Sequence, residues 1–385
     1  MTKPTISARI KLHEIVPAAA QQSAVTASRL LRDRVSHTPA SSTVDRLTAI
    51  WRRVLQRPSI GINDHFFSVG GGFHTADMLF AAIAQQYGRE LPSATIYHAP
   101  TIVQLARLLD QPALPRFSPF VEVKAGSEKP PILIVHGLAG TVPFFELAQA
   151  MATVDHPVYG IQAKGVDGLE EPLDRVEDMA TFYLRSLRDI QPHGPYILIG
   201  YSFGGLVALE MAQSLQEVGE NVALLALVDA YPDARYMAAG QRLRLRAQRV
   251  GSRIGDLQKR SVHAGISYVA RRLKNRLRVG GVDDAGNLPS GASRLSFEHA
   301  TLGVKQKAYV ALARYRPQFY GGKIKFVKSE SDSYYPANPA AVWAQLAGEF
   351  ECDSVPGGHL DMITGDIKSL ADVLARYVNE ALPAK

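Results

Sequence analysis

A serine flanked by glycines is the residue pattern in this chain with the clearest chemical potential. Gly200-Tyr201-Ser202-Phe203-Gly204 follows an apolar run and opens a helical pattern of apolar residues. Strand, tight turn and helix together are the setting of a nucleophile elbow, which exposes a serine hydroxyl above a sheet. Because the helix starts at the serine, its unpaired N–H groups and positive dipole end would face a developing oxyanion. Ser202 is therefore the candidate nucleophile.

A serine hydroxyl needs a histidine base, and the histidine needs a carboxylate that fixes its tautomer and stabilises its charged form. In folds with this elbow the three residues follow in the order serine, acid, histidine. His359 meets that order, since it lies on a glycine-rich loop just beyond the last strand-like run. His136 is the main rival, but it ends an apolar run that precedes the serine.

The acid has two candidates. Asp229 ends the apolar run at 224–229, and Asp332, with Glu330 beside it, follows the next run at 323–328. Both stand at the carboxyl ends of expected strands, where open parallel sheets gather their functional groups. The residues by themselves leave both acids open.

These side chains need a sheet whose strand ends meet at one edge. Short apolar runs that could be buried strands alternate with longer helical patterns, which favours a mostly parallel sheet with helices on both faces. The expected strands are 132–136, 158–162, 196–200, 224–229, 323–328 and 351–355. The expected helices include 174–190, 203–218 and 368–382.

A separate helical unit is predicted at 41–111, where three patterns of apolar residues have helical spacing. The first pattern includes Leu47, Ile50 and Trp51. Residues 1–40 are interpreted as a tail or linker. The proline-containing stretch 112–128 is predicted to be a linker. The second domain is assigned to 129–385, and its first residues are expected from near Phe120.

Length and composition fit a packed two-domain protein. The chain has 385 residues, of which 46% are hydrophobic and 21% charged. Cys352 is the single cysteine, which rules out an internal disulfide and fits a reducing compartment. No apolar run approaches the roughly 20 residues that span a bilayer, and the first 35 residues lack the apolar core of a signal peptide. We therefore expect a cytoplasmic protein without membrane association.

The net charge of +7 comes from one segment. Residues 235–278 hold thirteen basic residues and one acid, a local net charge of +12, so the rest of the chain carries −5. This distribution argues against a general nucleic-acid-binding surface. No His/Cys/Asp cluster has metal-ligand spacing and no G-x-G-x-x-G opens a first strand–helix turn, so no metal or redox cofactor is expected.

The second domain resembles the thioesterase domains that terminate polyketide and nonribosomal peptide assembly lines. The resemblance covers roughly 130–382, through "ILIVHGLAG", "GPYILIGYSFGGLVALEMAQSL", "LALVDAYP" and "VPGGHLDMI". It implies an α/β-hydrolase fold with a helical lid at about 231–305. It also favours Asp229 over Asp332, because the family's acid stands in an Asp-x-Tyr-Pro motif.

The same resemblance assigns the oxyanion hole. One backbone N–H is expected from Phe203, directly after the nucleophile. The other is expected from Leu138, with Ala139 as its neighbour, in the loop that follows the first strand of the domain. Within the implied lid, the basic residues are either a solvated helix face or a site that attracts a phosphate, an acidic carrier or an anionic acyl chain.

The helical unit resembles a carrier domain of the same assembly lines, through "INDHFFSVGGG" and "LPSATIYHAPTIVQLARLL". In that family a serine after the paired glycines carries phosphopantetheine, and the aligned residue here is Phe73, which has no nucleophilic oxygen. The nearest hydroxyls, Ser68 and Thr75, are out of register. Either the carrier fold has lost its cargo site or the residue was changed by design. We expect no covalently bound phosphopantetheine and a substrate arm supplied by a partner carrier in trans.

The sequence therefore predicts a serine thioesterase that releases an acyl, polyketide or peptidyl chain from a carrier-bound thioester by hydrolysis or cyclisation. The alternative is a stand-alone esterase or thioesterase that acts on acyl-CoA or small esters, with the helical unit as a docking module. A third possibility, a non-catalytic interaction protein, is disfavoured by the apparently intact set of Ser202, Asp229 and His359.

Overall fold

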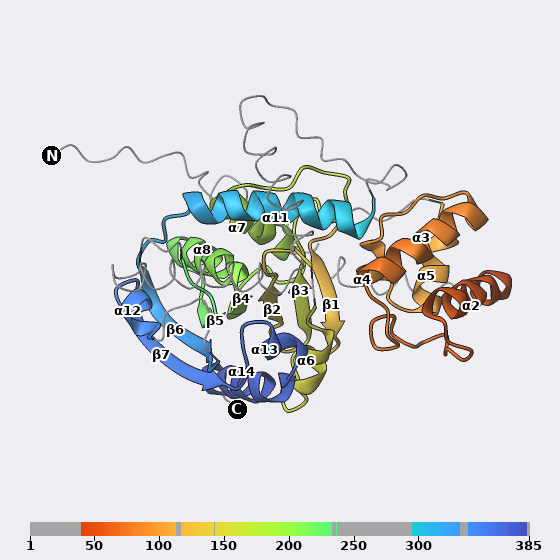
Figure 1. Ribbon diagram of the computed structural model, residues 1–385. Coiled ribbons are helices and arrows are strands. Elements are labelled where there is room, and N and C mark those ends of the chain that lie inside the picture. Colours follow the sequence, from red (N-terminus) through yellow and green to blue (C-terminus); the bar gives the residue numbers. More distant parts are fainter. Residues whose placement is uncertain are drawn as a thin grey trace, which may run out of the picture.

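A seven-stranded sheet forms the centre of the larger part of the molecule (Figure 1). The computed structural model describes residues 40–112, 117–141, 143–232, 236, 295–331 and 338–382. The strand order is β1-β3-β2-β4-β5-β6-β7, and only β1 runs antiparallel to its neighbour. The strands are β1 Phe120–Lys124, β2 Ile132–Val135, β3 Val158–Ile161, β4 Tyr196–Tyr201, β5 Val222–Val228, β6 Tyr320–Ser329 and β7 Ala347–Val355.

The six strands expected from apolar runs are confirmed. Every residue of β2 and of β4 is buried, as in strands covered on both faces. The last two strands are longer than expected: β6 also includes residues 320–322 and 329, and β7, the edge strand, also includes residues 347–350. The added residues include Gly321, Gly322 and Gly348, which interrupt the apolar pattern, so periodicity in apolar residues could not mark these ends.

The edge strand β1 lies inside the stretch 112–128 that is predicted to be a linker, and it begins at Phe120, near which the second domain is expected to start. Its residues pair antiparallel with β3, and Val121 and Val123 are buried while Glu122 between them is exposed. Prolines and glycines around this short alternating run suggested a linker. Such residues are also tolerated beside edge strands, which need ladder hydrogen bonds on one side only.

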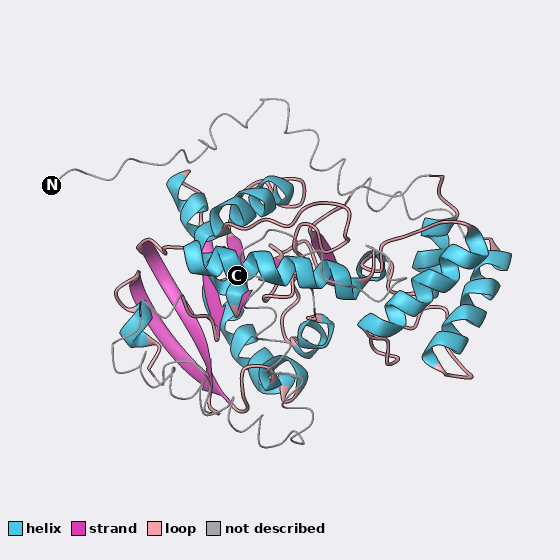
Figure 2. Cartoon of the chain, turned by 45° about the horizontal axis from the view of Figure 1, so that its top comes forward, coloured by secondary structure: helices cyan, strands magenta, loops and turns pink. Residues whose placement is uncertain are grey.

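Helices cover both faces of the sheet (Figure 2). Helices α6 (Phe145–Ala150) and α14 (Ile367–Ala381) share one hydrophobic cluster with one sheet face. Helices α7 (Val176–Leu187) and α8 (Phe203–Glu217) share a second cluster with the opposite face. The mostly parallel α/β architecture expected from the sequence is thus confirmed.

Helix α11 (Phe297–Arg314) runs along the sheet domain and reaches the helical unit with its N-terminal end (Figure 1). The Ser296 hydroxyl caps it by accepting from the His299 N–H at 3.4 Å. Its buried residues recur at helical spacing on one face: Phe297, Ala300, Val304, Ala308 and Ala311. Phe297 and Val304 belong to the first cluster, and Ala308 and Ala311 to the second.

The N-terminal unit contains the three predicted helices and one short additional helix. They are α2 Ser41–Leu55, α3 Phe73–Tyr87, α4 Thr95–His98 and α5 Ile102–Leu109. Trp51 and Phe66 meet edge to face at its centre, with ring centroids 5.2 Å apart. Thr101 and Gln104 form a capping box that starts α5.

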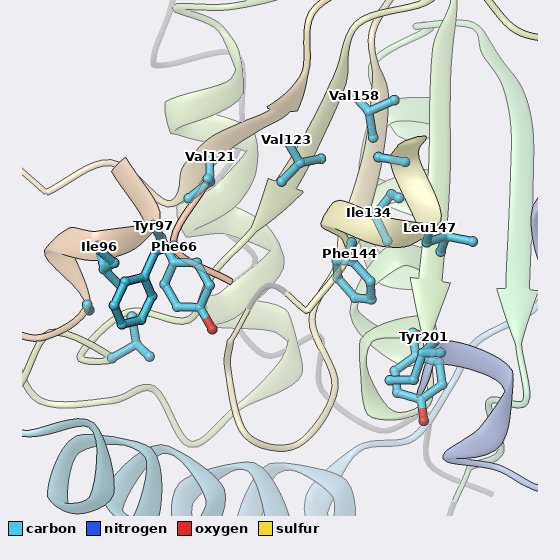
Figure 3. Close-up of a cluster of buried hydrophobic side chains, with 14 of the residues drawn as sticks. Phe66, Ile96, Tyr97, Val121, Val123, Ile134, Phe144, Leu147, Val158 and Tyr201 are labelled. Carbon is cyan, nitrogen blue, oxygen red and sulfur yellow. The ribbon is translucent and has the colours of Figure 1, made fainter. Parts of the chain in front are cut away.

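The helical unit and the sheet domain share a single hydrophobic cluster. Figure 3 shows Tyr97 of α4 in the same group of buried side chains as Val121 of β1 and Tyr201 at the end of β4. A hydrogen bond of 3.0 Å from the Ser93 N–H to the Leu295 carbonyl also joins the two parts.

Two predicted regions fall largely outside the described residues, namely the tail at 1–40 and most of the lid at 231–305 with its basic cluster. Two further helices, α12 (Ala340–Trp343) and α13 (Asp361–Thr364), complete the described elements. None of the described helices is both long and apolar enough to cross a membrane. The same residues contain no group of three or more His, Cys, Asp or Glu side chains that could hold a metal ion.

Candidate active site

Ser202 occupies a strained turn between β4 and α8. Its backbone has φ 55° and ψ −123°, a region that residues with a side chain rarely adopt. The Ser202 N–H donates to the Val228 carbonyl of the neighbouring strand at 2.9 Å, which fixes the turn to the sheet. Strain of this kind persists where the surroundings over-determine it, as at functional sites.

The glycines around Ser202 are required by close backbone approach. A Cβ atom on Gly200 would lie 2.4 Å from the Cα of Gly205, where the strand and the helix cross. A Cβ atom on Gly204 would lie 2.2 Å from the His136 carbonyl oxygen. Both distances are far below van der Waals contact, so only glycine permits this packing of the elbow.

The structure brings Ser202, Asp229 and His359 into one chain of hydrogen bonds. The Ser202 Oγ lies 3.0 Å from Nε2 of His359, and Nδ1 of the same ring lies 2.7 Å from Oδ2 of Asp229. A carboxylate accepts, so Nδ1 carries the hydrogen and Nε2 is left to accept from the serine hydroxyl. The ring is therefore oriented to take a proton from Ser202.

Asp229 is fully buried directly after β5, with a positive φ of 45°. Its N–H donates to the Val327 carbonyl at 2.8 Å, and its Oδ2 also accepts from the Ser329 hydroxyl at 3.2 Å. Of the rival acids, Glu330 is exposed and Asp332 lies outside the described residues. Sequence reasoning missed Ser329, although its place at the end of the neighbouring strand β6 was a usable signal.

Tyr201 connects the nucleophile turn to the histidine loop. Its hydroxyl donates to the His359 carbonyl at 2.8 Å, and its ring stacks on the imidazole with centroids 5.1 Å apart. On the loop itself Gly357 has φ 87°, and the Gly358 N–H donates to Asp361 at 2.8 Å. Sequence reasoning also missed Tyr201, because it stands at the unspecified position of the serine motif.

His136, the rival base, has a structural environment. It is completely buried, with Nδ1 at 2.6 Å from the Gly137 carbonyl and Nε2 at 2.6 Å from the Tyr183 hydroxyl. The carbonyl can only accept, so Nδ1–H donates and Nε2 accepts from the tyrosine. Burial lowers the pKa of His136 to about 4 and raises the pKa of Tyr183. A neutral, doubly hydrogen-bonded ring fits a core position better than a base.

The two expected oxyanion donors lie on the elements that flank the serine. Phe203 is the first residue of α8, so its N–H has no partner within the helix. Leu138 lies in the loop 136–140, which the Gly140 N–H closes by donating to the Gly137 carbonyl at 3.1 Å. Within the part of the chain that the structure describes, the backbone N–H groups of Phe203 and Leu138 donate to no protein acceptor.

Phe73 stands at the first residue of α3 and does not fit covalent attachment of phosphopantetheine, since its side chain has no oxygen. Thr75, one of the two nearest hydroxyls, is engaged in capping: it accepts from the Gly72 N–H at 2.7 Å and donates to the Gly72 carbonyl at 3.0 Å. Ser68, the other, is exposed on the preceding loop.

Two families match the chain by their sequence patterns. The "Thioesterase domain" family matches residues 130–377, and the "Phosphopantetheine attachment site" family matches residues 45–109. The order of the matches is that of a carrier domain followed by a thioesterase domain.

Similar curated proteins include synthetases that are much longer than this chain. The chain is 29% identical over 331 residues to malpibaldin synthetase of Mortierella alpina, a match that covers 84% of this chain and 6% of the relative. It is 36% identical over 199 residues to the dimodular nonribosomal peptide synthase of Bacillus subtilis (strain 168), covering 51% of this chain and 8% of the relative. The chain thus spans less than a tenth of the length of these relatives.

A crystal structure of a four-domain nonribosomal peptide synthetase in its holo form, bound to AMP and glycine, matches the fold. The TM-score is 0.52 at 22% sequence identity, and the match covers 91% of this chain and 27% of that one. At this identity the likeness concerns the fold alone.

Proposed function

Because this chain belongs to the thioesterase domain family and carries a carrier-family domain ahead of it, we propose that it releases an acyl, polyketide or peptidyl chain from a carrier-bound thioester through an acyl-enzyme on Ser202. The observation that carries the proposal is the continuous set of hydrogen bonds from Ser202 through His359 to Asp229. Each contact has the length and direction that proton transfer from the serine requires.

Acylation begins when Nε2 of His359 takes the hydroxyl proton as the Ser202 Oγ attacks the thioester carbonyl carbon. Asp229 stabilises the imidazolium that forms. The N–H groups of Phe203 and Leu138 donate to the oxyanion of the tetrahedral intermediate, each contributing roughly 3 kcal/mol. The C–S bond then breaks, and the departing sulfur receives the proton from His359 and leaves as a thiol.

Deacylation repeats these reaction steps with an oxygen or nitrogen nucleophile. His359 takes a proton from water, or from a hydroxyl or amine at the far end of the bound chain. The nucleophile adds to the ester carbonyl, the bond to Ser202 breaks, and the serine oxygen recovers its proton from His359. Water gives a free acid, whereas an internal nucleophile gives a ring.

The substrate arm is proposed to arrive on a separate carrier. Phe73 offers no oxygen for attachment, and the Thr75 hydroxyl is occupied in capping α3. The relatives are synthetases of much greater length than this chain, which supports an assembly line as the source of the loaded carrier.

A fluorophosphonate probe together with a soluble acyl thioester tests the nucleophile. We expect the probe to label the protein once, and Ser202→Ala to abolish labelling and lower kcat by at least about 10³-fold. Ser68→Ala, at an exposed serine of the helical unit, serves as the matched control and should behave as the unmodified protein. Labelling that survives in Ser202→Ala would exclude the proposed acyl-enzyme.

Intact-protein mass spectrometry tests the origin of the arm. After incubation with coenzyme A and a promiscuous phosphopantetheinyl transferase, we expect no added mass on the full chain. Phe73→Ser, which supplies the missing hydroxyl, should then gain one phosphopantetheine. Addition to the unmodified protein would contradict delivery in trans.

A further inference from the structure

Phe73 contacts the thioesterase domain through its ring. The ring centroid lies 5.0 Å from that of Phe297, the first residue of α11. Tyr97 of α4 meets the same Phe297 ring edge to face at 5.6 Å. Phe297 is completely buried between them, whereas Phe73 is 44% exposed. The residue at the expected cargo position is therefore an apolar contact between the two parts of the chain.

Polar contacts hold the same end of α11. The Phe297 N–H donates to Oδ1 of Asp77, a carboxylate of α3, at 2.8 Å. A carboxylate at this position also interacts favourably with the positive end of the α11 dipole. With the hydrogen bond from Ser93 to Leu295, the helical unit fixes both the chain entering α11 and its first turn.

Further along the same face, α11 contacts the loop that holds an expected oxyanion donor. Val304 lies two turns beyond Phe297. Its Cγ1 would be 2.5 Å from a Cβ atom on Gly140, so the helix packs directly on the backbone of loop 136–140. That loop carries Leu138. One helix face thus contacts the cargo-position residue at one end and the oxyanion loop farther along.

The helical unit also contacts the chain that leaves this loop. The ring of Phe145, the first residue of α6, lies 4.1 Å from the ring of His65 and 5.8 Å from that of Phe67. Loop 136–140 is therefore bordered by α11 on one side and followed by α6, and the helical unit packs against both helices. The shared hydrophobic cluster is consistent with this arrangement (Figure 3).

We propose that the carrier-like unit acts as a fixed support for the oxyanion loop, with Phe73 as the residue that anchors it to α11. Phe73 is a positioning residue that acts through Phe297, Val304 and Gly140 and does not touch the substrate. The inference rests on the proposed serine mechanism, in which small displacements of a backbone donor lower the rate of the chemical step. A unit anchored in this way supports the thioesterase domain instead of carrying cargo to it.

Kinetics on a soluble acyl thioester, which needs no carrier, test the catalytic effect in the full chain. We expect Phe73→Ala to lower kcat at least fivefold while KM changes less than twofold. Phe73→Leu, which restores an apolar side chain, should recover most of the loss. Met78→Ala is the matched control, because Met78 is on the same helix and 46% exposed, and its kcat should be unchanged.

Hydrogen exchange gives a readout that does not depend on activity. We expect faster amide exchange in loop 136–140 and in the first two turns of α11 for Phe73→Ala, but not for Met78→Ala. Unfolding curves at the assay temperature show that each variant is folded. If Ser202→Ala keeps full activity, the serine mechanism fails, while the exchange result still decides whether Phe73 supports the loop.

Slower turnover together with faster exchange in both segments supports the proposal. Unchanged exchange in Phe73→Ala overturns it, whatever the rate. Unchanged kcat with faster exchange also overturns it, because the loop would then move without consequence for the chemistry. A rise in KM alone would assign Phe73 to substrate binding and would equally overturn the supporting role.

Discussion

At the scale of single residues, Tyr201 and the buried His136 show how side chains outside the proposed triad hold the loops of the candidate site. Tyr201 lies one residue before the nucleophile and contacts His359 through both its ring and its hydroxyl. His136 lies at the end of β2 and is hydrogen bonded to Gly137 and Tyr183. Neither is placed to transfer a proton to the substrate, yet each fixes a loop that bears on the reaction.

Replacing Tyr201 separates the effects of its hydroxyl and its ring. Tyr201→Phe keeps the stacked ring and loses one hydrogen bond of net worth about 1 kcal/mol, so we expect kcat to fall about fivefold. Tyr201→Leu also loses the stacking on the imidazole, so its kcat should fall further, by about 30-fold in total. KM for a soluble thioester should stay constant in both. Equal kcat for all three proteins would contradict a positioning role.

Folding stability at low pH is predicted to depend on His136. Burial lowers its pKa to about 4 in the folded chain, below the roughly 6.5 of an unfolded histidine. The folded state therefore binds this proton more weakly. The stability that comes from the neutral ring is complete above pH 6.5 and declines as the pH falls towards 4. Glutamine does not titrate in this range. Between pH 7 and pH 5 the free energy of unfolding of His136→Gln should therefore fall by about 2 kcal/mol less than that of the unmodified protein.

Denaturant titrations of both proteins at several pH values measure this difference. Because both proteins contain other titrating groups, the informative quantity is the difference between the pH dependences of their free energies of unfolding. Parallel pH dependences would mean that His136 is already free to take up a proton in the folded state.

At the scale of elements, two glycines in helices should respond oppositely to the same substitution. A Cβ atom on Gly204, in the first turn of α8, would lie 2.2 Å from the carbonyl oxygen of His136 and 2.5 Å from that of Val135. Gly303, in α11, has no atom within 4 Å of a built Cβ. Gly204 is thus packed against the backbone at the end of β2, whereas Gly303 has free space on the side where a Cβ atom would be.

We expect Gly204→Ala to lower the free energy of unfolding by at least about 2 kcal/mol, because backbone atoms cannot move aside cheaply. Gly303→Ala should raise it by about 0.5–1 kcal/mol, since alanine restricts the unfolded chain and favours helix. Denaturant unfolding measures both. Destabilisation by Gly303→Ala would show that the open side of α11 is covered in solution.

At the scale of the whole molecule, the helical unit and the sheet domain share one hydrophobic cluster, with Phe297 and Phe145 as contacts on the sheet-domain side. Independent domains joined by a linker unfold separately, whereas domains with a common core unfold together. We therefore expect one cooperative transition in scanning calorimetry of the full chain.

Phe297→Ala tests the origin of that cooperativity. Removal of a fully buried phenylalanine costs about 3–5 kcal/mol, and here it is lost from the junction of the two parts. The variant should show either a lower midpoint or two separated transitions. Two transitions in the unmodified protein would contradict a shared core.

Local sequence patterns predicted most of the fold and the residues proposed for catalysis. Apolar runs located six of the seven strands, most clearly β2 and β4, because a strand buried on both faces cannot tolerate polar side chains. The serine motif located Ser202 because the turn demands glycine neighbours, and chain order then indicated His359. Resemblance to a known family was needed to prefer Asp229 over Asp332, since both follow expected strands.

The sequence alone determined the element types, the α/β class and the candidate nucleophile and base, because these depend on periodicity and turn chemistry within short stretches. Only the tertiary structure decided which distant residues meet: Tyr201 with His359, Ser329 with Asp229, and Phe73 with Phe297. Such contacts join segments up to 224 residues apart in the chain. They follow from strand order and helix packing, which no local pattern encodes. For that reason Phe73 could be recognised from sequence as a missing serine, but not as a contact with the thioesterase domain.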